Sequence, residues 1–288
     1  MEITDLKTLV SVVEKGGITR AAEELHRVPS SVTTRILQLE DSLGVRLFLR
    51  EGKRLMITPE GQTLYAYARQ VLHLVAEAED RVKNRKPGGT FRLGAMENTA
   101  AIRLPRPLAD LHRLHPGIDL ELATGTSSLM YRMLLENELD AVFIADTPPD
   151  ARVERAETFA EELVIITPPG HPAVRDPEDI GRKTLLAFKD GCAYRSRLIG
   201  WFRSHGREPE KVAGLASYHA ILGGVAAGMG VGVVPTGILD IFPEKDAIAA
   251  HPFPLPFGRA VTELVWRGGM FSANIEALLG TLQASRAA

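Results

Sequence analysis

The sequence predicts an α/β protein in three parts: a small helical N-terminal domain that ends in a β-hairpin, a long linker helix, and a two-lobed α/β domain. Three observations lead to this prediction. Two apolar repeats of helical spacing are separated by a proline within residues 18–43. A heptad row of apolar residues follows within residues 59–83. From residue 91 onward, strand-like runs alternate with helical patterns, which favours a parallel or mixed sheet covered by helices.

The composition is that of an ordinary soluble globular protein, with 45% hydrophobic and 24% charged residues in a chain of 288. The formal net charge is −2, so a DNA-binding role depends on where the charges lie and not on their sum. Cys192 is the only cysteine, which excludes an intrachain disulfide. The acidic start, residues 1–5, is unlike a signal peptide, and no apolar run approaches ~20 residues. We therefore expect a cytoplasmic protein without a membrane segment.

The stretch 18–43 predicts two short helices with a tight break at Pro29, because proline disfavours helix in the residue before it. Ser30 or Ser31 is expected to cap the second helix. Short hydroxyls and an arginine near the start of a helix suit a major groove, where they reach base edges and phosphates. The expected DNA-binding residues of this region are Arg20, Pro29, Ser30, Ser31, Thr33, Thr34, Arg35 and Gln38. The alternative is an amphipathic helix pair of any α-helical domain.

A short hairpin is expected next, with strands at 45–48 and 55–57 around a turn at 51–53. The cations Arg50, Lys53 and Arg54 lie on this hairpin, where they would contact phosphates beside the groove. The alternative for any one of them is a solvated charged turn.

A long linker helix is predicted to begin with Thr58 as N-cap and Pro59 as its first residue. Its apolar positions repeat at spacings of three and four, as in a coiled coil. This expected dimer seam consists of Leu64, Ala68, Val71, Val75, Ala78 and Val82. A polar hinge with Pro87 and two glycines follows it. A dimer would place two recognition helices on half-sites about one DNA turn (~34 Å) apart. The alternative is a core helix of a globular domain.

The C-terminal two-thirds predicts strands at 91–96, 118–123, 141–145, 163–167, 184–188, 231–235 and 261–266, and helices at 101–115, 128–137, 195–205 and 218–228. Two such α/β units joined by crossovers would leave a cleft between lobes. Ligands of open α/β sheets bind beyond the carboxyl ends of the strands.

Polar residues just past strands, and those that precede the glycine-rich helix, are the candidates for this cleft. The first group is Glu97, Asn98, Thr99, Thr126, Ser127, Ser128, Cys192, Tyr194 and Arg195, and the second is Tyr218 and His219. Thr99 could cap the helix that follows it, and helix N-terminal N–H groups favour an anionic ligand group. Glu97 instead suits a cationic group, so the ligand could carry an amine. The alternative for any one of these residues is a helix cap or a satisfied loop.

Several ordered motifs resemble the winged helix-turn-helix signature of LysR-type transcriptional regulators. They are Ala21-Ala22, Leu25-His26, Gln38-Leu39-Glu40, Leu43-Gly44-Val45, Leu47-Phe48-Leu49-Arg50 and Ile57-Thr58-Pro59-Glu60-Gly61. The usual Gln-Pro and Ser-Arg pairs of that signature are replaced here by Pro29-Ser30 and Thr33-Thr34. These departures affect which side chain reads bases and not the fold.

The resemblance implies three segments: a DNA-binding domain at 1–58, a linker helix and hinge at 59–89, and an effector-binding domain at 90–288. The last would resemble a small periplasmic binding protein, with lobe I at about 90–161 plus 265–288 and lobe II at about 162–264. The glycine-rich segment 222–235 also fits the family. The implied partners are double-stranded DNA, a small-molecule effector, the transcription machinery, and further copies of the chain in a homodimer that usually pairs into a homotetramer.

A narrower resemblance links the chain to the putrescine-utilisation regulators of that family. It rests on Leu93-Gly94 with Glu97, Cys192 with Tyr194-Arg195, and Ser217-Tyr218-His219. It would place a polyamine or a related amine against Glu97.

Enzymatic functions find little support in the sequence. The glycines at 228, 230 and 232 follow a helix and enter a strand, the reverse of a phosphate-binding turn. His112 and His115 lack a third ligand at metal spacing. Cys192 is interpreted as a packed or pocket-lining thiol, although a reactive thiol remains the alternative. We therefore expect no catalytic residue, cofactor or metal. The competing hypothesis is a small-molecule-binding protein or enzyme of binding-protein fold with an incidental N-terminal domain.

Overall fold

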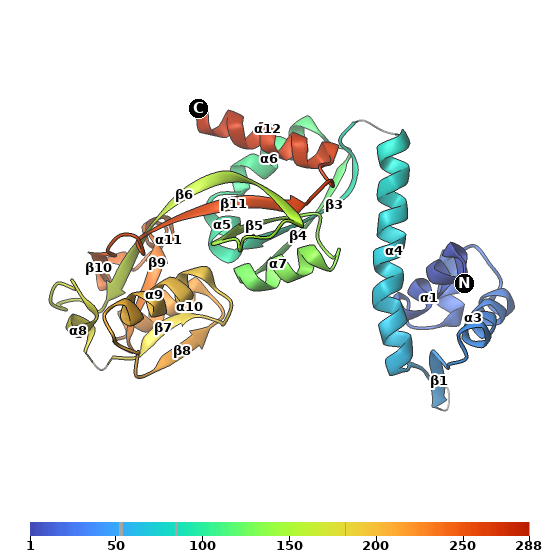
Figure 1. Ribbon diagram of the computed structural model, residues 1–288, viewed down its shortest axis with the longest axis horizontal. Helices are drawn as coiled ribbons and strands as arrows, with labels where there is room; N and C mark the ends of the chain where they lie inside the picture. The colour runs from blue at the N-terminus through green and yellow to red at the C-terminus, as the bar shows by residue number, and fades with distance from the viewer. Residues whose placement is uncertain (52–53, 84–85, 182, 288) are drawn as a thin grey trace. The chain divides into compact units, whose positions relative to one another are not determined.

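The computed structural model describes residues 1–51, 54–83, 86–181 and 183–287. It divides into two compact units, Met1–Arg85 and Lys86–Ala288, which are considered separately (Figure 1). Across the described ranges, none of the helices is both long and apolar enough to cross a bilayer.

The N-terminal unit is a helical domain with a hairpin and one long helix. Its elements are α1 (Ile3–Glu14), α2 (Ile18–Glu24), α3 (Pro29–Leu43), β1 (Phe48–Glu51), β2 (Arg54–Ile57) and α4 (Pro59–Lys83). The first three helices share one apolar core, in which Leu9, Ala21 and Leu39 are almost completely buried. Gly44 ends α3 in the left-handed conformation (φ +70°), which a residue with a Cβ adopts only at a cost.

The hairpin is attached to α3 through a buried carboxylate. Glu40 is only 5% exposed. Its side chain accepts the backbone N–H groups of Leu47 (2.8 Å) and Phe48 (3.1 Å) and pairs with the Arg46 guanidinium at 2.7 Å. These bonds satisfy a charge that would otherwise be costly to bury. The hairpin is thus held at a set position relative to the helix that precedes it.

The second unit is a two-lobed α/β domain. Its elements are β3 (Gly89–Met96), α5 (Glu97–Ile102), α6 (Pro105–Leu114), β4 (Ile118–Gly125), α7 (Ser127–Leu135), β5 (Ala141–Ala145), β6 (Val153–Thr167), α8 (Pro177–Ile180), β7 (Leu185–Phe188), α9 (Ala193–Ser204), β8 (Val212–Leu215), α10 (Tyr218–Ala226), β9 (Val231–Pro235), α11 (Thr236–Asp240), a 3-10 turn (Lys245–Ala247), β10 (Ala249–Pro252), β11 (Arg259–Arg267) and α12 (Ala273–Ala287).

One mixed sheet runs through both lobes in the order β4-β3-β5-β11-β6-β9-β7-β8, with β10 paired to β6. In lobe I, β3 is parallel to β4 and β5, and β11 is antiparallel to β5. Phe143 of β5 packs in the cluster with α6 and α12, while its neighbours Val142 and Ile144 pack in the cluster with α7. The strand is therefore buried on both faces, which explains its unbroken apolar run.

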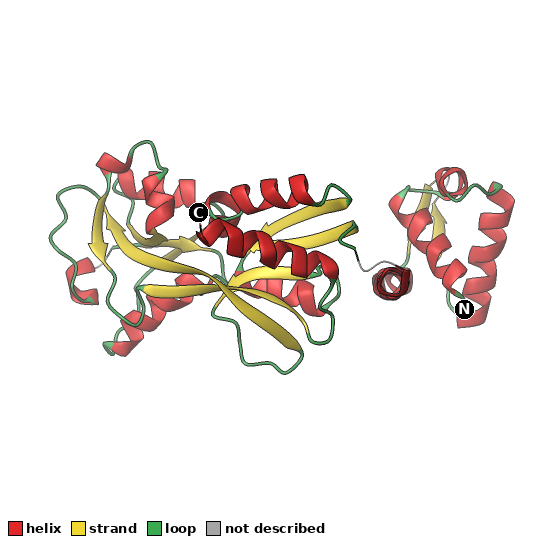
Figure 2. Cartoon of the chain, turned by 90° about the horizontal axis from the view of Figure 1, so that it is seen from above, coloured by secondary structure: helices red, strands yellow, loops and turns green. Residues whose placement is uncertain are grey.

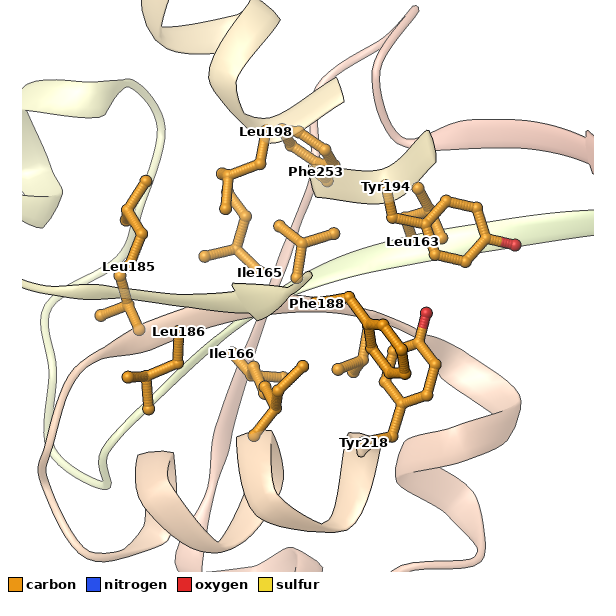
Figure 3. Close-up of a cluster of buried hydrophobic side chains, with 14 of the residues drawn as sticks. Leu163, Ile165, Ile166, Leu185, Leu186, Phe188, Tyr194, Leu198, Tyr218 and Phe253 are labelled. Atoms are coloured by element: carbon orange, nitrogen blue, oxygen red, sulfur yellow. The ribbon is translucent and has the colours of Figure 1, made fainter. Parts of the chain in front are cut away.

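Lobe II repeats this arrangement with shorter strands, β7 being parallel to β8 and β9. Its core packs the strands of the lobe against α9 and α10. Tyr194 and Tyr218 lie at the same end of this core (Figure 3).

Two long antiparallel strands, β6 and β11, connect the lobes (Figure 2). Their register shifts between Thr262 and Glu263, where Thr158 of β6 is the extra residue. The Thr158 hydroxyl donates to the carbonyl of Thr262 at 2.7 Å, so the bulge leaves that carbonyl with a partner.

The predicted α/β class with its three parts is confirmed, and several element boundaries were wrong. The helix expected at 101–115 is two helices, α5 and α6, because Pro105 has no N–H to continue the ladder of α5 and is instead tolerated as the first residue of α6. The strand expected at 163–167 is the end of β6, whose first half is mostly exposed or partly buried and carries several charges. Strands β8 and β10 were not predicted, since neither has the continuous buried apolar run that marks the equally short β7.

Candidate functional site

The exposed surface of α3 collects most of the predicted DNA-binding residues. Pro29, Ser30, Ser31, Thr34 and Gln38 are all exposed on it. The helix begins at Pro29 and has Val28 as its N-cap, without a side-chain capping bond. The expectation that Ser30 or Ser31 caps this helix was therefore wrong, because proline is tolerated at the first helical position. Both hydroxyls remain available at an open helix N-terminus, which favours phosphate.

Two predicted base readers are engaged within the domain. The Arg35 guanidinium pairs with the Asp5 carboxylate of α1 at 2.8 Å, and the Thr33 hydroxyl donates to the Pro29 carbonyl at 3.0 Å. The apolar periodicity of α3 could not reveal the contact between Arg35 and Asp5, since Asp5 lies thirty residues earlier in the chain. Arg20 is exposed, and its guanidinium donates only a long bond (3.4 Å) to the Lys15 carbonyl.

Leu37 was not among the predicted DNA-binding residues. It is 44% exposed and lies three residues after Thr34, on the same face of the helix. An apolar side chain there can contact a thymine methyl group. Its signal in the sequence was weak, because leucine at a helical position is normally assigned to the core.

The side chains of the predicted hairpin cations lie outside the described residues. Lys53 lies outside the described residues, and so do the side chains of Arg50 and Arg54, although the backbone of both belongs to the paired strands β1 and β2.

The first half of the expected dimer seam packs inside the chain's own N-terminal unit. Ala68 is completely buried, and Leu64 and Leu72 pack against the same core. Ala68 is therefore not available to a dimer seam and Leu64 is only partly available, because a heptad pattern does not say which partner covers each face. The side chain of Val82 lies outside the described residues.

A second row on α4 is left exposed. Tyr67, Val71 and Leu74 are 62%, 39% and 55% exposed, and Ala78 continues the row. The spacing of four, three and four residues repeats the coiled-coil pattern. Large apolar side chains in a continuous row mark an interaction surface.

The predicted cleft residues are brought together where the lobes meet. The Asn98 amide donates to the Tyr194 hydroxyl (3.2 Å), and the Tyr218 N–H donates to the Glu97 carboxylate (3.3 Å). The Ser128 N–H donates to the Gly191 carbonyl (3.1 Å). Each contact joins a helix start in lobe I to a segment at a helix start in lobe II. These residues therefore lie close together, and their role in binding an effector stays a prediction.

Two buried polar atoms in this cleft lack partners. Asn98 and Thr99 are completely buried, and among the described residues neither Asn98 Oδ1 nor Thr99 Oγ1 makes a hydrogen bond. Such groups are rare in folded proteins and indicate a ligand or ordered water. Thr99 is the third residue of α5 and not its cap, so that prediction was wrong.

Other members of the predicted set support the fold locally. Thr126 caps α7 by accepting the Leu129 N–H at 3.3 Å, and the Ser127 hydroxyl donates to the Met96 sulfur at 3.2 Å. Arg195 pairs with Asp190 at 2.7 Å and donates to the Phe188 carbonyl at 3.2 Å. His219 is exposed.

The two lobes are in contact at these residues through the hydrogen bonds described above. Within lobe II, a cavity lined by Cys192, Tyr194 and Tyr218 has a volume of about 10 Å³, which is close to the minimum for one water molecule. A larger cavity of about 480 Å³ lies beside α7 and is lined by Ser127, Ser128 and Asp146 among others. The volume of this second cavity lies in the range of small-molecule sites.

Electrostatics distinguish Glu97 from an ordinary surface acid. Burial raises the pKa of this carboxyl group above its ordinary value, while the Tyr218 N–H and nearby His219 oppose the rise. A half-buried carboxylate with a raised pKa gains most from a cationic partner, which restores the charged form.

Cys192 is expected to react slowly with peroxide and with thiol reagents. It is 7% exposed, and burial raises the pKa of its thiol although the α9 N–H groups and Arg195 act in the opposite direction. The thiolate is the reactive form, so labelling of the native protein at pH 7.5 should be at least about tenfold slower than labelling in guanidinium. Mass spectrometry of the labelled peptide measures both rates, and equal rates would contradict the assignment of an inert thiol.

Comparison with known proteins supports both parts of this description. The family model for the bacterial regulatory helix-turn-helix protein of the lysR family matches residues 3–62, and the LysR substrate binding domain matches residues 84–287. The chain is 33% identical over 252 residues to the HTH-type transcriptional regulator GltR of Bacillus subtilis, which covers 87% of this chain and 85% of that protein. It is 34% identical over 275 residues to the uncharacterized HTH-type transcriptional regulator YusT of the same species, covering 95% and 92%.

Solved structures agree in fold. Full-length OxyR from Pseudomonas aeruginosa superposes with a TM-score of 0.72 at 25% identity, covering 98% of this chain and 95% of that chain. Full-length CbnR complexed with its target DNA superposes with a TM-score of 0.71 at 22% identity, covering 99% and 100%. The relatives are transcriptional regulators and not enzymes, which removes the competing enzyme hypothesis. The chain belongs to the LysR family of ligand-responsive, DNA-binding transcriptional regulators.

Proposed function

We propose that the protein binds a two-fold symmetric DNA operator as a homodimer and reads it with the exposed face of α3. The observation that carries the proposal is the open N-terminus of α3, where Ser30 and Ser31 are exposed and no side chain caps the helix. Phosphate at this N-terminus would orient the helix, and Thr34, Leu37 and Gln38 on the same exposed face would read bases. Arg35 is left out of the reading set because Asp5 holds it.

The dimer is proposed to form through the row Tyr67, Val71, Leu74 and Ala78 of α4. Two copies of one helix can cover these side chains mutually, as a two-fold interface requires. The dimer is further proposed to pair into a tetramer in the cytoplasm and to act on the transcription machinery. CbnR, the structural relative above, has been solved with its target DNA.

Selection of duplexes from a random library by the full-length protein tests this function. Enriched sequences should contain two inverted half-sites about one helical turn apart (~34 Å), because a symmetric dimer presents two recognition helices. Absence of enrichment above that of non-specific binding would refute the proposal.

The effector is proposed to be a small amine, such as the polyamine that the putrescine-utilisation subgroup would use. Glu97 supports this proposal because its carboxylate is half-buried and one of its two oxygens accepts the Tyr218 N–H. A bound ammonium group would pair with the carboxylate, and Asn98 Oδ1 offers a further buried acceptor. Binding would shift the population of lobe arrangements, and a changed angle between paired DNA-binding domains would change DNA bending.

Replacing Glu97 with Gln is expected to remove the response to amines. A diamine at 100 times its dissociation constant should stabilise the native protein by ~2.7 kcal/mol, which shifts the melting temperature by several degrees. The Glu97→Gln variant should lose this shift because the amide cannot pair with an ammonium group. Glu138→Gln is the matched control, since Glu138 is an exposed acid of the same lobe. A shift with carboxylates and none with diamines would rule out the amine.

A further inference from the structure

An ion pair joins the two lobes outside the set of cleft residues described above. Asp146 directly follows β5 in lobe I, and Arg197 lies on α9 in lobe II. The Arg197 Nε and Nη2 atoms donate to the two Asp146 carboxylate oxygens at 2.8 and 2.5 Å. The pair is bidentate and partly shielded, since the side chains are 20% and 39% exposed. Such pairs are stronger and more directional than ordinary surface ion pairs.

The arginine is already oriented by lobe II. Its third nitrogen, Nη1, donates to the carbonyls of Pro256 (3.2 Å), Phe257 (3.3 Å) and Arg259 (2.8 Å), in the segment that leads into β11. These bonds do not involve lobe I, so they can hold the guanidinium in place when the lobes separate. Formation of the pair with Asp146 then costs little side-chain entropy.

The acid is also held in an unusual conformation. Asp146 has φ +56°, a left-handed value that aspartate tolerates better than most residues. The two lobes also lie close together at Gly191, where an added Cβ would lie 2.8 Å from the Ser128 Cβ. Ion pair and glycine together allow the lobes to come into contact at this edge.

We propose that the Asp146–Arg197 pair is a latch that holds the two lobes closed in the absence of effector. The Asp146 and Arg197 side chains must separate before the lobes can move apart, so the pair lowers the fraction of molecules whose lobes are open to an effector. Apparent affinity falls with the fraction of molecules in the competent state. The effect of the pair on effector affinity rests on the proposed function, whereas its effect on the contact between the lobes does not.

Hydrogen exchange of the full-length protein, without DNA or effector, tests the latch. Two backbone N–H groups donate across the lobes, Ser128 to Gly191 and Tyr218 to Glu97. Asp146→Asn removes the charge while asparagine retains the shape and the tolerance of positive φ, so the variant should fold. Exchange in peptides that contain Ser128 and Tyr218 should become roughly fivefold faster or more, the lower end of a typical coupling between two states.

Asp150→Asn is the matched control. Asp150 also pairs with an arginine, Arg152 at 2.6 Å, but both residues belong to lobe I. This variant should leave exchange at Tyr218 unchanged. Gly191→Ala should accelerate both reporters by wedging the lobes apart, which shows that they respond to opening. Unchanged exchange in Asp146→Asn, or equal acceleration in Asp150→Asn, would overturn the latch, whereas failure of DNA selection would overturn only the proposed function.

Discussion

Replacing Leu74 with Glu is expected to dissociate the dimer and to weaken operator binding by about 100-fold or more. Leu74 is 55% exposed in the chain and lies in the middle of the row that starts at Tyr67. Burial of one leucine side chain contributes about 1.5–3 kcal/mol, and a two-fold interface contains the residue twice. The glutamate also places two like charges at the centre of the seam. A monomer would reach only one half-site.

Ala76→Glu is the matched control for this experiment. Ala76 is an exposed residue of α4, and its place two residues after Leu74 puts it on the opposite side of the helix. The Ala76→Glu substitution introduces the same charge into the same helix but outside the row. Sedimentation equilibrium should show a monomer for Leu74→Glu and the wild-type assembly for Ala76→Glu. An intact dimer in the first variant would refute the row as the interface.

Replacing Ser30 with Asp is expected to abolish DNA binding and to leave the fold intact. Ser30 is the second residue of α3, where a carboxylate interacts favourably with the helix dipole by about 0.3–1 kcal/mol. The same carboxylate would face DNA phosphates, and opposing like charges cost several kcal/mol, so affinity should fall by about 100-fold or more at low salt. Binding of specific and non-specific duplexes should fall together, because phosphates carry no sequence information.

Thr4→Asp separates this effect from a change in net charge. Thr4 is the exposed second residue of α1, so the new carboxylate has the same position in a helix of the same domain. Its DNA affinity should remain within a few-fold of the wild type, with the melting temperature of both variants measured alongside. Equal losses in the two variants would mean that Ser30 has no special place at the interface.

The N-terminal unit was predictable because its determinants are local. Pro29, Gly44 and Pro59 punctuate the helices at the positions where breaks were expected, and the apolar spacing between them has the helical period. The DNA-facing set was less predictable, since the Arg35 guanidinium turns to Asp5 in another helix. Long charged side chains have several possible partners within reach, and periodicity does not choose among them.

In the effector domain, too, some features were predictable from the sequence and others were not. Glu97, Asn98 and Tyr218 could be assigned to a cleft because polar groups that follow parallel strands converge at one sheet edge. Their pairing across the lobes, and the Asp146–Arg197 contact fifty-one residues apart in sequence, could not be assigned. The strand β10 was not predicted because its pairing with β6, and not its own residue pattern, makes it a strand.

By itself, the sequence determined the family and the order of the parts, because these follow from turn residues, apolar period and ordered motifs, and the two binding surfaces that it indicates stay predictions. Only the tertiary structure decided which apolar face of α4 is covered by its own domain, which arginines are already paired, and which residues of the two lobes meet. The physical reason is that each depends on packing between distant segments. A local pattern specifies that a face is apolar or that a side chain is charged, and the fold specifies what meets it.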